Sequence, residues 1–119
     1  MANQYTDLDR AFHALSDPTR RAIVARLAQG PASVTALSQP FSMAMPTLLQ
    51  HIRVLEEGGL VVTKKEGRVR TCSIRPAAFA TACGWLDRQR SIWEERLDRM
   101  EAYVAELQAR EKKHGKRNR

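Results

Sequence analysis

The chain has 119 residues, the size of one globular domain, and its 43% hydrophobic and 28% charged residues exclude a disordered or fibrous protein. No apolar run approaches the ~18 residues of a membrane span, and two cysteines are too few for a disulfide-rich secreted scaffold, so we expect a cytoplasmic protein without membrane contact. The net charge is +7, of which the last ten residues (REKKHGKRNR) supply +5, so the rest of the chain is only mildly basic.

The first part of the chain predicts three helices in succession. A helix over residues 7–15 is expected because apolar residues recur there at intervals of three and four. Asp17 and Pro18 then end this helix and begin a second one, since aspartate accepts hydrogen bonds from free helix amides and proline suits the first helical turn. Ser33 is expected to cap a short third helix.

A fourth helix is predicted from about Met43 to Glu57, after a tight turn, and the pair Gly58-Gly59 ends it. Its buried stripe is expected to come from some combination of five apolar residues: Met45, Leu48, Leu49, Ile52 and Leu55.

The sequence period then changes to that of β-strands. Residues 60–63 and 69–74 are rich in β-branched side chains, and a charged segment with Gly67 as the turn residue lies between them. A β-hairpin is therefore predicted directly after the fourth helix.

From Pro76 onward the chain is again expected to be helical. A short piece over residues 77–82, loosened at Gly84, should precede a long helix from Trp85 to about Arg110. Residues 110–119 are expected to form a disordered basic tail, for which a solvated terminus and a polyanion contact both stay open, and residues 1–109 the domain. The long helix carries apolar residues at heptad-like intervals, interrupted at Arg90: Leu86, Trp93, Leu97, Met100, Val104 and Leu107.

This order of elements predicts a mainly α fold with a small β-hairpin. A short and a longer helix joined by a tight turn and followed at once by a charged hairpin are typical of a winged helix-turn-helix. A plain helical bundle with an incidental hairpin is the alternative, and it is less favoured because only Gly58-Gly59 separate the fourth helix from the hairpin.

Polar residues at the start of the fourth helix and basic residues in the hairpin together predict binding to double-stranded DNA. In the major groove glutamine pairs with adenine and arginine with guanine, while hydroxyl groups contact phosphates. A basic hairpin can straddle the phosphate backbone and place an arginine in the minor groove, although lysines also protect exposed strands from aggregation. The candidate DNA contacts are Ser42, Thr47, Gln50, His51 and Arg53 in the helical part, and Lys64, Lys65, Arg68 and Arg70 in the hairpin.

The apolar stripes of the first and last helices exceed what one small core can cover, so a homodimer with two-fold symmetry is expected. The candidate interface residues are Leu8, Phe12, Trp85, Trp93, Leu97, Met100, Val104 and Leu107.

Enzyme signatures are missing from the sequence. It has no phosphate-binding loop, no G-x-S-x-G and no H-E-x-x-H, so no catalytic residues and no cofactor are expected. Two alternatives to a sequence-specific DNA-binding protein stay open: a helical protein-interaction module, and a nonspecific nucleic-acid binder driven by the basic tail.

The motifs ALSDPTRRAI, QHIRVLEEGGLV and EGRVR, in this order, resemble the ArsR-type winged-helix transcriptional regulators, in particular a metal-independent branch with a similar last helix. The resemblance covers about residues 5–108. It implies a homodimeric repressor that dimerises through its first and last helices. It further implies two recognition helices that read successive half-sites of a palindromic operator, often in the regulator's own promoter.

Some positions depart from the family pattern. Leu49 stands where many members have a serine, so that serine's DNA contact is not carried over and Leu49 is expected in the core. His51 matches the family's histidine, for which packing and base contact both stay open. Arg20 and Arg21 match the start of the second helix, where phosphate contact, ion pairing and simple solvation are all consistent. Cys72 replaces a common tyrosine of the hairpin.

No metal site is expected, although many ArsR-type relatives sense metals. Thiolate sensing needs clustered cysteines, whereas Cys72 and Cys83 lie on different predicted elements and the three histidines are scattered. We interpret both cysteines as small packing residues rather than as a redox switch.

Overall fold

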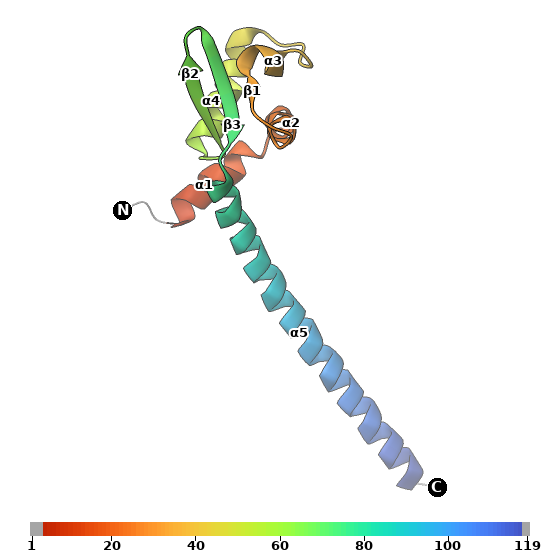
Figure 1. Ribbon diagram of the computed structural model, residues 1–119. Coiled ribbons are helices and arrows are strands. Elements are labelled where there is room, and N and C mark those ends of the chain that lie inside the picture. Colours follow the sequence, from red (N-terminus) through yellow and green to blue (C-terminus); the bar gives the residue numbers. More distant parts are fainter. Residues whose placement is uncertain (1–3, 118–119) are drawn as a thin grey trace. The chain divides into compact units, whose positions relative to one another are not determined.

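The computed structural model describes residues 4–117, and its elements follow the predicted order with one additional strand (Figure 1). Contacts divide the chain into two compact units, with the boundary between Cys83 and Gly84, within the range predicted as one domain. The elements are α1 (Gln4–Ala14), α2 (Pro18–Leu27), β1 (Ala32–Ser33), α3 (Val34–Ser38), α4 (Met45–Glu57), β2 (Val61–Glu66), β3 (Val69–Ile74) and α5 (Pro76–Arg117).

The core of the first unit is formed by apolar residues of its helices and of its sheet. Three of the five residues predicted for the α4 stripe lie in it, because positions 48, 52 and 55 fall within a narrow arc of the helix. The other two candidates, Met45 and Leu49, are 41% and 39% exposed, so the expectation that Leu49 lies in the core is wrong. The largest fully buried side chains are Ile23, Leu37, Leu48, Ile52, Leu55, Leu60 and Cys72.

The predicted hairpin is confirmed, and it is part of a three-stranded antiparallel sheet of order β1-β3-β2. Gly67 has φ +62° and begins the two-residue turn between Glu66 and Val69, a left-handed conformation that favours glycine. The additional strand β1 pairs Ala32 with Cys72. We refer to the β2–β3 hairpin as the wing.

The start of α2 has the predicted cap. The Asp17 carboxylate accepts a hydrogen bond of 3.0 Å from the backbone N–H of Arg20, and Pro18 occupies the first turn. This hydrogen bond, together with the nearby charges of His51 and Arg20, lowers the pKa of Asp17 below its ordinary value. Ser33 caps α3 in the same way, accepting from the N–H of Ala36 at 3.0 Å.

The end of α4 packs closely on α1. A Cβ atom at Gly58 would lie 2.8 Å from the Cβ of Ala14 and 3.0 Å from the carbonyl oxygen of Arg10, so only glycine fits without a shift. Gly59 follows with φ +74°, as expected of the glycine that ends a helix.

The second unit is the distal part of α5, which is one continuous helix (Figure 1). The helix is continuous through Gly84, where the sequence predicted a loosening, since one glycine costs only about 1 kcal/mol in a helix. It also continues as far as Arg117 through the predicted tail, of which residues 118–119 lie outside the described part. Arg110 pairs with Glu106 at 2.8 Å, one helical turn away, and basic residues suit a helix C-terminus.

Apolar side chains of this helix at heptad-like spacing are exposed, and we call them the α5 seam. Trp93 and Met100 are 59% and 62% exposed within the single chain. None of the helices in residues 4–117 combines the length and the hydropathy that a membrane span requires. The α5 seam consists of Leu86, Trp93, Leu97, Met100, Val104 and Leu107.

Candidate DNA-binding surface

The outward face of α4 carries the polar side chains that the sequence predicted. Thr47, Gln50 and Arg53 are exposed, on the side of the helix away from the buried stripe. Ser42 is exposed just before the helix begins. The side chains of Gln50 and Arg53 form no hydrogen bond or ion pair with other residues of the described range, so they are available to a ligand.

The wing carries an unbalanced positive charge. Lys65 lies directly opposite Arg70 across the hairpin, an arrangement of like charges that does not stabilise the strand pair. Lys64 is different, because its ammonium group lies 3.2 Å from the carboxylate of Glu66. Arg68, in the turn, forms no ion pair with the described residues. The uncompensated cations of the wing are therefore Lys65, Arg68 and Arg70.

Two adjoining hollows bring α4 and the wing together. One, of about 740 Å³, is lined by Gln50 and Arg53 of the helix and by Arg70 of the wing, together with the carboxylates Glu56 and Glu57 at the end of α4. The other, of about 560 Å³, lies between the start of α4 and the wing residues Lys65 and Arg68. Leu49 and Arg70 line both hollows, so the two form one continuous surface. We call this the α4–wing surface. Its carboxylates are Glu56 and Glu57, and the members on which the argument below depends are Met45, Leu49, Gln50, Arg53, Lys65, Arg68, Val69 and Arg70.

Four of the predicted contacts line neither hollow: Ser42, Thr47, His51 and Lys64. The imidazole of His51 is half-buried, with Nδ1 3.3 Å from a guanidinium nitrogen of Arg20 and 3.9 Å from the carboxylate of Asp17. Packing against α2 is thus the interpretation that the structure favours for His51.

Arg20 and Arg21 connect the end of α1 to α2. Arg20 donates hydrogen bonds to the carbonyl oxygens of Ala14 at 2.7 Å and of His13 at 3.1 Å, and Arg21 donates to that of Leu15 at 2.9 Å. Their guanidinium groups therefore satisfy helix-end carbonyls, a structural role that the sequence had left open.

Sequence reasoning missed three apolar members of the α4–wing surface: Met45, Leu49 and Val69. Five apolar residues in α4 are too many for one buried stripe, so the sequence did indicate that some of them would be exposed. Which of them stay exposed depends on how far the sheet extends over the helix, which periodicity does not reveal.

The two cysteines are free and lie in different environments. Cys72 is fully buried in the core, and burial raises the pKa of its thiol, whereas Cys83 is exposed. Within residues 4–117, no three His, Cys, Asp or Glu side chains are arranged to hold a metal ion.

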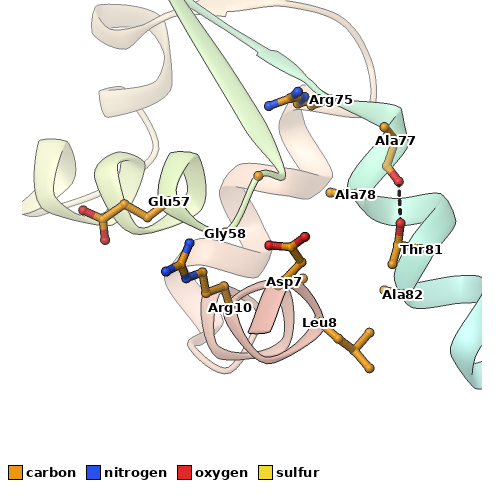
Figure 2. Close-up of a pocket in the computed structure, with 12 residues that line it drawn as sticks. Asp7, Leu8, Arg10, Glu57, Gly58, Arg75, Ala77, Ala78, Thr81 and Ala82 are labelled. Carbon is orange, nitrogen blue, oxygen red and sulfur yellow. Dashed lines mark hydrogen bonds between the residues drawn. The ribbon is translucent and has the colours of Figure 1, made fainter. Parts of the chain in front are cut away.

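Another hollow, of about 270 Å³, lies between α1, the end of α4 and the first turns of α5 (Figure 2). Its charged lining residues are two acidic and two basic side chains, Asp7, Glu57, Arg10 and Arg75, so it has no net charge to select an anion. Small residues form the rest, and the hydroxyl of Thr81 is engaged by the carbonyl oxygen of its own helix. The α4–wing surface differs, because its two hollows together have four basic residues and only two carboxylates.

Comparison with known proteins agrees with this geometry. A family profile described as a helix-turn-helix domain matches residues 15–64. The chain is 40% identical over 84 residues to the HTH-type transcriptional regulator Rv2034 of Mycobacterium tuberculosis, covering 71% of this chain and 78% of the relative. It is 23% identical over 79 residues to the transcriptional repressor SdpR of Bacillus subtilis, covering 66% of this chain and 88% of the relative.

A solved structure extends the likeness to three dimensions. The crystal structure of the ArsR family transcriptional regulator RHA00566 superposes with a TM-score of 0.71 at 48% identity, covering 74% of this chain and 97% of that chain. About a quarter of the present chain thus lies outside a match that includes nearly all of the neighbour. With a helix-turn-helix, a basic wing and relatives matched over most of their length, this chain belongs to the ArsR family of winged helix-turn-helix transcriptional regulators.

Proposed function

We propose that this protein is a homodimeric repressor that binds a palindromic operator in double-stranded DNA through the α4–wing surface. The observation that carries the proposal is the junction of the two hollows, where hydrogen-bonding side chains of α4 meet the uncompensated cations of the wing. Gln50 and Arg53 would contact base edges in the major groove, since they suit adenine and guanine respectively.

The wing would hold the phosphate backbone. The opposed pair Lys65 and Arg70 is unfavourable for an isolated hairpin, and a phosphate group between the two would turn this repulsion into attraction. Arg68, at the tip, would reach the backbone or the narrow minor groove. Ser42 and Thr47, near the start of α4, would contact phosphates, and Lys64 would do so by exchanging the carboxylate of Glu66 for a phosphate.

The remaining predicted contact, His51, would position the helix. Its ring lies between Arg20 and Asp17 of the α2 start, so it links α4 to the element behind it. We assign it a supporting role in the orientation of α4 and no base contact.

The exposed α5 seam is the structural argument for the proposed homodimer. Its apolar side chains are exposed along one helix at spacings of seven, four, three, four and three, and a second copy would bury them in a coiled coil. Trp85 and Phe12 are half-buried and could extend the interface, whereas Leu8 is only 7% exposed and is already packed within its own chain.

The charges that flank the α5 seam favour a parallel pair. The flank that follows Leu86, Trp93 and Met100 is acidic, with Asp87, Glu94 and Glu101, and the opposite flank carries Arg96 and Arg110. In a parallel coiled coil each acidic flank faces the basic flank of the partner, whereas an antiparallel pair sets like flanks together. Arg90 interrupts the seam, and its charge is compensated on its own helix by Asp87 at 3.2 Å and Glu94 at 3.8 Å.

Selection from a randomised duplex library, followed by anisotropy titrations of the enriched and a scrambled duplex at two salt concentrations, tests the proposal. We expect a palindrome with half-sites ~34–36 Å apart and a preference that survives at the higher salt. Absence of any enriched motif, with binding to both duplexes that collapses with salt, would contradict it. Removal of residues 110–119 is the control, because the basic tail alone should not account for the preference.

A further inference from the structure

The α4–wing surface contains an apolar patch that neither the core nor the hydrogen-bonding side chains explain. Met45 and Leu49 of α4 are 41% and 39% exposed, and Val69 at the base of the wing turn is 51% exposed. All three line the same hollow as Lys65, Arg68 and Arg70. The patch is therefore bordered by uncompensated cations on the wing side and by the neutral polar residues Ser33 and Thr35 on the α3 side.

This border indicates what the patch binds. Three cations around an apolar patch suit a partner that is anionic at its edges and carries small apolar groups between them. In the major groove of DNA, phosphates provide the anionic edges, and the C5-methyl groups of thymine are the apolar groups presented by the bases. The cations at the edge of the patch thus match the phosphates, and its apolar side chains match the thymine methyl groups.

The positions along α4 support the same ligand. Met45 and Leu49 are one helical turn apart, so their side chains lie one above the other on the helix surface. Leu49 is next to Gln50, and both line the hollow that also contains Arg53. A helix that presents Gln50 to adenine therefore presents Leu49 to the adjacent part of the groove, where the methyl group of a thymine lies.

We infer that Leu49, with Met45 beside it, reads thymine methyl groups in each half-site. The inference rests on the proposed DNA-binding function. It adds a specificity element, since Gln50 and Leu49 together would distinguish an A·T pair from all others, while Arg53 would read a neighbouring guanine.

Replacement of single thymines by deoxyuridine in the enriched duplex tests the inference, because deoxyuridine lacks only the methyl group. We expect at least one position per half-site at which this change lowers the affinity by about four-fold, the effect of one buried methyl group. In Leu49→Ala the parent duplex should bind more weakly, and the deoxyuridine penalty at that position should vanish. The matched control is Val62→Ala, an exposed aliphatic side chain of β2 outside both hollows, which should keep the penalty.

The outcomes separate the two proposals. Binding of the enriched duplex without any deoxyuridine effect would overturn the methyl contact and leave the repressor function standing. A deoxyuridine penalty that persists in both Leu49→Ala and Met45→Ala would assign the methyl contact to another residue and overturn the inference. Absence of an enriched duplex would instead contradict the proposed function itself. Thermal unfolding of each variant checks the fold, which should hold because both side chains are exposed.

Discussion

The α4–wing surface and the α5 seam are both exposed, yet their chemistry points to different partners. The α4–wing surface mixes a small apolar patch with amide and guanidinium groups that form no ion pair with described residues, so it can distinguish ligands by shape, charge and hydrogen bonding. The α5 seam is apolar along its length, and only its flanks carry charge. A surface of the second kind is best covered by another copy of itself. Under the proposed function, DNA recognition and dimer assembly are therefore carried by separate parts of this chain.

The largest expected effect comes from charge placed in the α5 seam. Leu97→Glu combined with Val104→Glu should halve the mass measured by light scattering, because four carboxylates would meet in an apolar interface. Affinity for the palindrome should fall by roughly 100-fold or more, since bivalent binding is lost. The control is Ala102→Glu combined with Ala105→Glu, which adds the same charge off the seam. A mutant that remains dimeric would show that the seam is not the interface.

Two arginines of the α4–wing surface should respond differently to removal. Arg53→Ala should cost ~1–3 kcal/mol of binding free energy and relax the preference at one base position, as expected for a lost bidentate contact. Arg68→Ala should weaken binding to all sequences and reduce the salt slope by about 1, since it would contact phosphate. Anisotropy titrations of the enriched duplex and its single-base variants measure both. Equal, sequence-independent losses would contradict this division of roles.

Two glycines, one in each compact unit, should differ in how an added methyl group changes the free energy of unfolding. Gly58→Ala should lower the free energy of unfolding by ~1–3 kcal/mol, because the added Cβ would lie 2.8 Å from that of Ala14 and must displace α1 or α4. Gly115→Ala, in the distal α5 helix, meets no atom within 4 Å and should not destabilise the protein. Urea unfolding followed by circular dichroism measures the difference. Equal stability of the two variants would mean that the α1–α4 contact is looser than described.

The two compact units also differ in how accurately the sequence predicts their secondary structure. The predicted helices and hairpin of the first unit are confirmed, because their ends depend on residues close in sequence: the helix caps Asp17 and Ser33 and the turn residue Gly67. The strand β1 could not be found, because two residues are too short to show a period. The exposure of Leu49 depends on where the sheet ends, which is a tertiary property.

The α5 helix extends beyond its predicted bounds at both ends, and one physical reason explains both differences. Gly84 and the basic run after Arg110 are unfavourable or neutral for a helix when considered singly, but helix propagation is cooperative and a continuing helix absorbs such costs.

For the candidate site, residue type alone suggested nine DNA contacts, whereas the structure groups Gln50, Arg53 and three wing cations and places His51 elsewhere. Grouping of this kind requires distances between elements that are remote in sequence.

A smaller effect tests the orientation of the α5 pair. Arg96→Glu alone and Glu101→Arg alone should each lower the dimer's thermal stability slightly, because each sets like charges opposite one another in a parallel pair. The double variant restores opposite charges and should recover the stability of the parent protein. Loss of stability that simply adds in the double variant would indicate that these flanks do not meet, as in an antiparallel pair.

The smallest expected effect is the pH dependence of the contacts that Asp17 makes at the start of α2, next to His51 of α4. The pKa of Asp17 is lowered in the folded state by the Arg20 backbone N–H and by the charges of His51 and Arg20, so the ionised carboxylate stabilises the fold. This contribution is complete above the ordinary carboxyl pKa of 3.8 and is lost as the pH falls through the lowered value. Asp17→Ala should therefore be less stable than the parent at pH ~7, and the difference should narrow as urea unfolding is repeated toward pH ~3. Asp17→Asn keeps a capping oxygen but no charge, so it should lie between the two at neutral pH. A stability difference that is the same at every pH would show that ionisation of Asp17 contributes nothing to the stability of the fold.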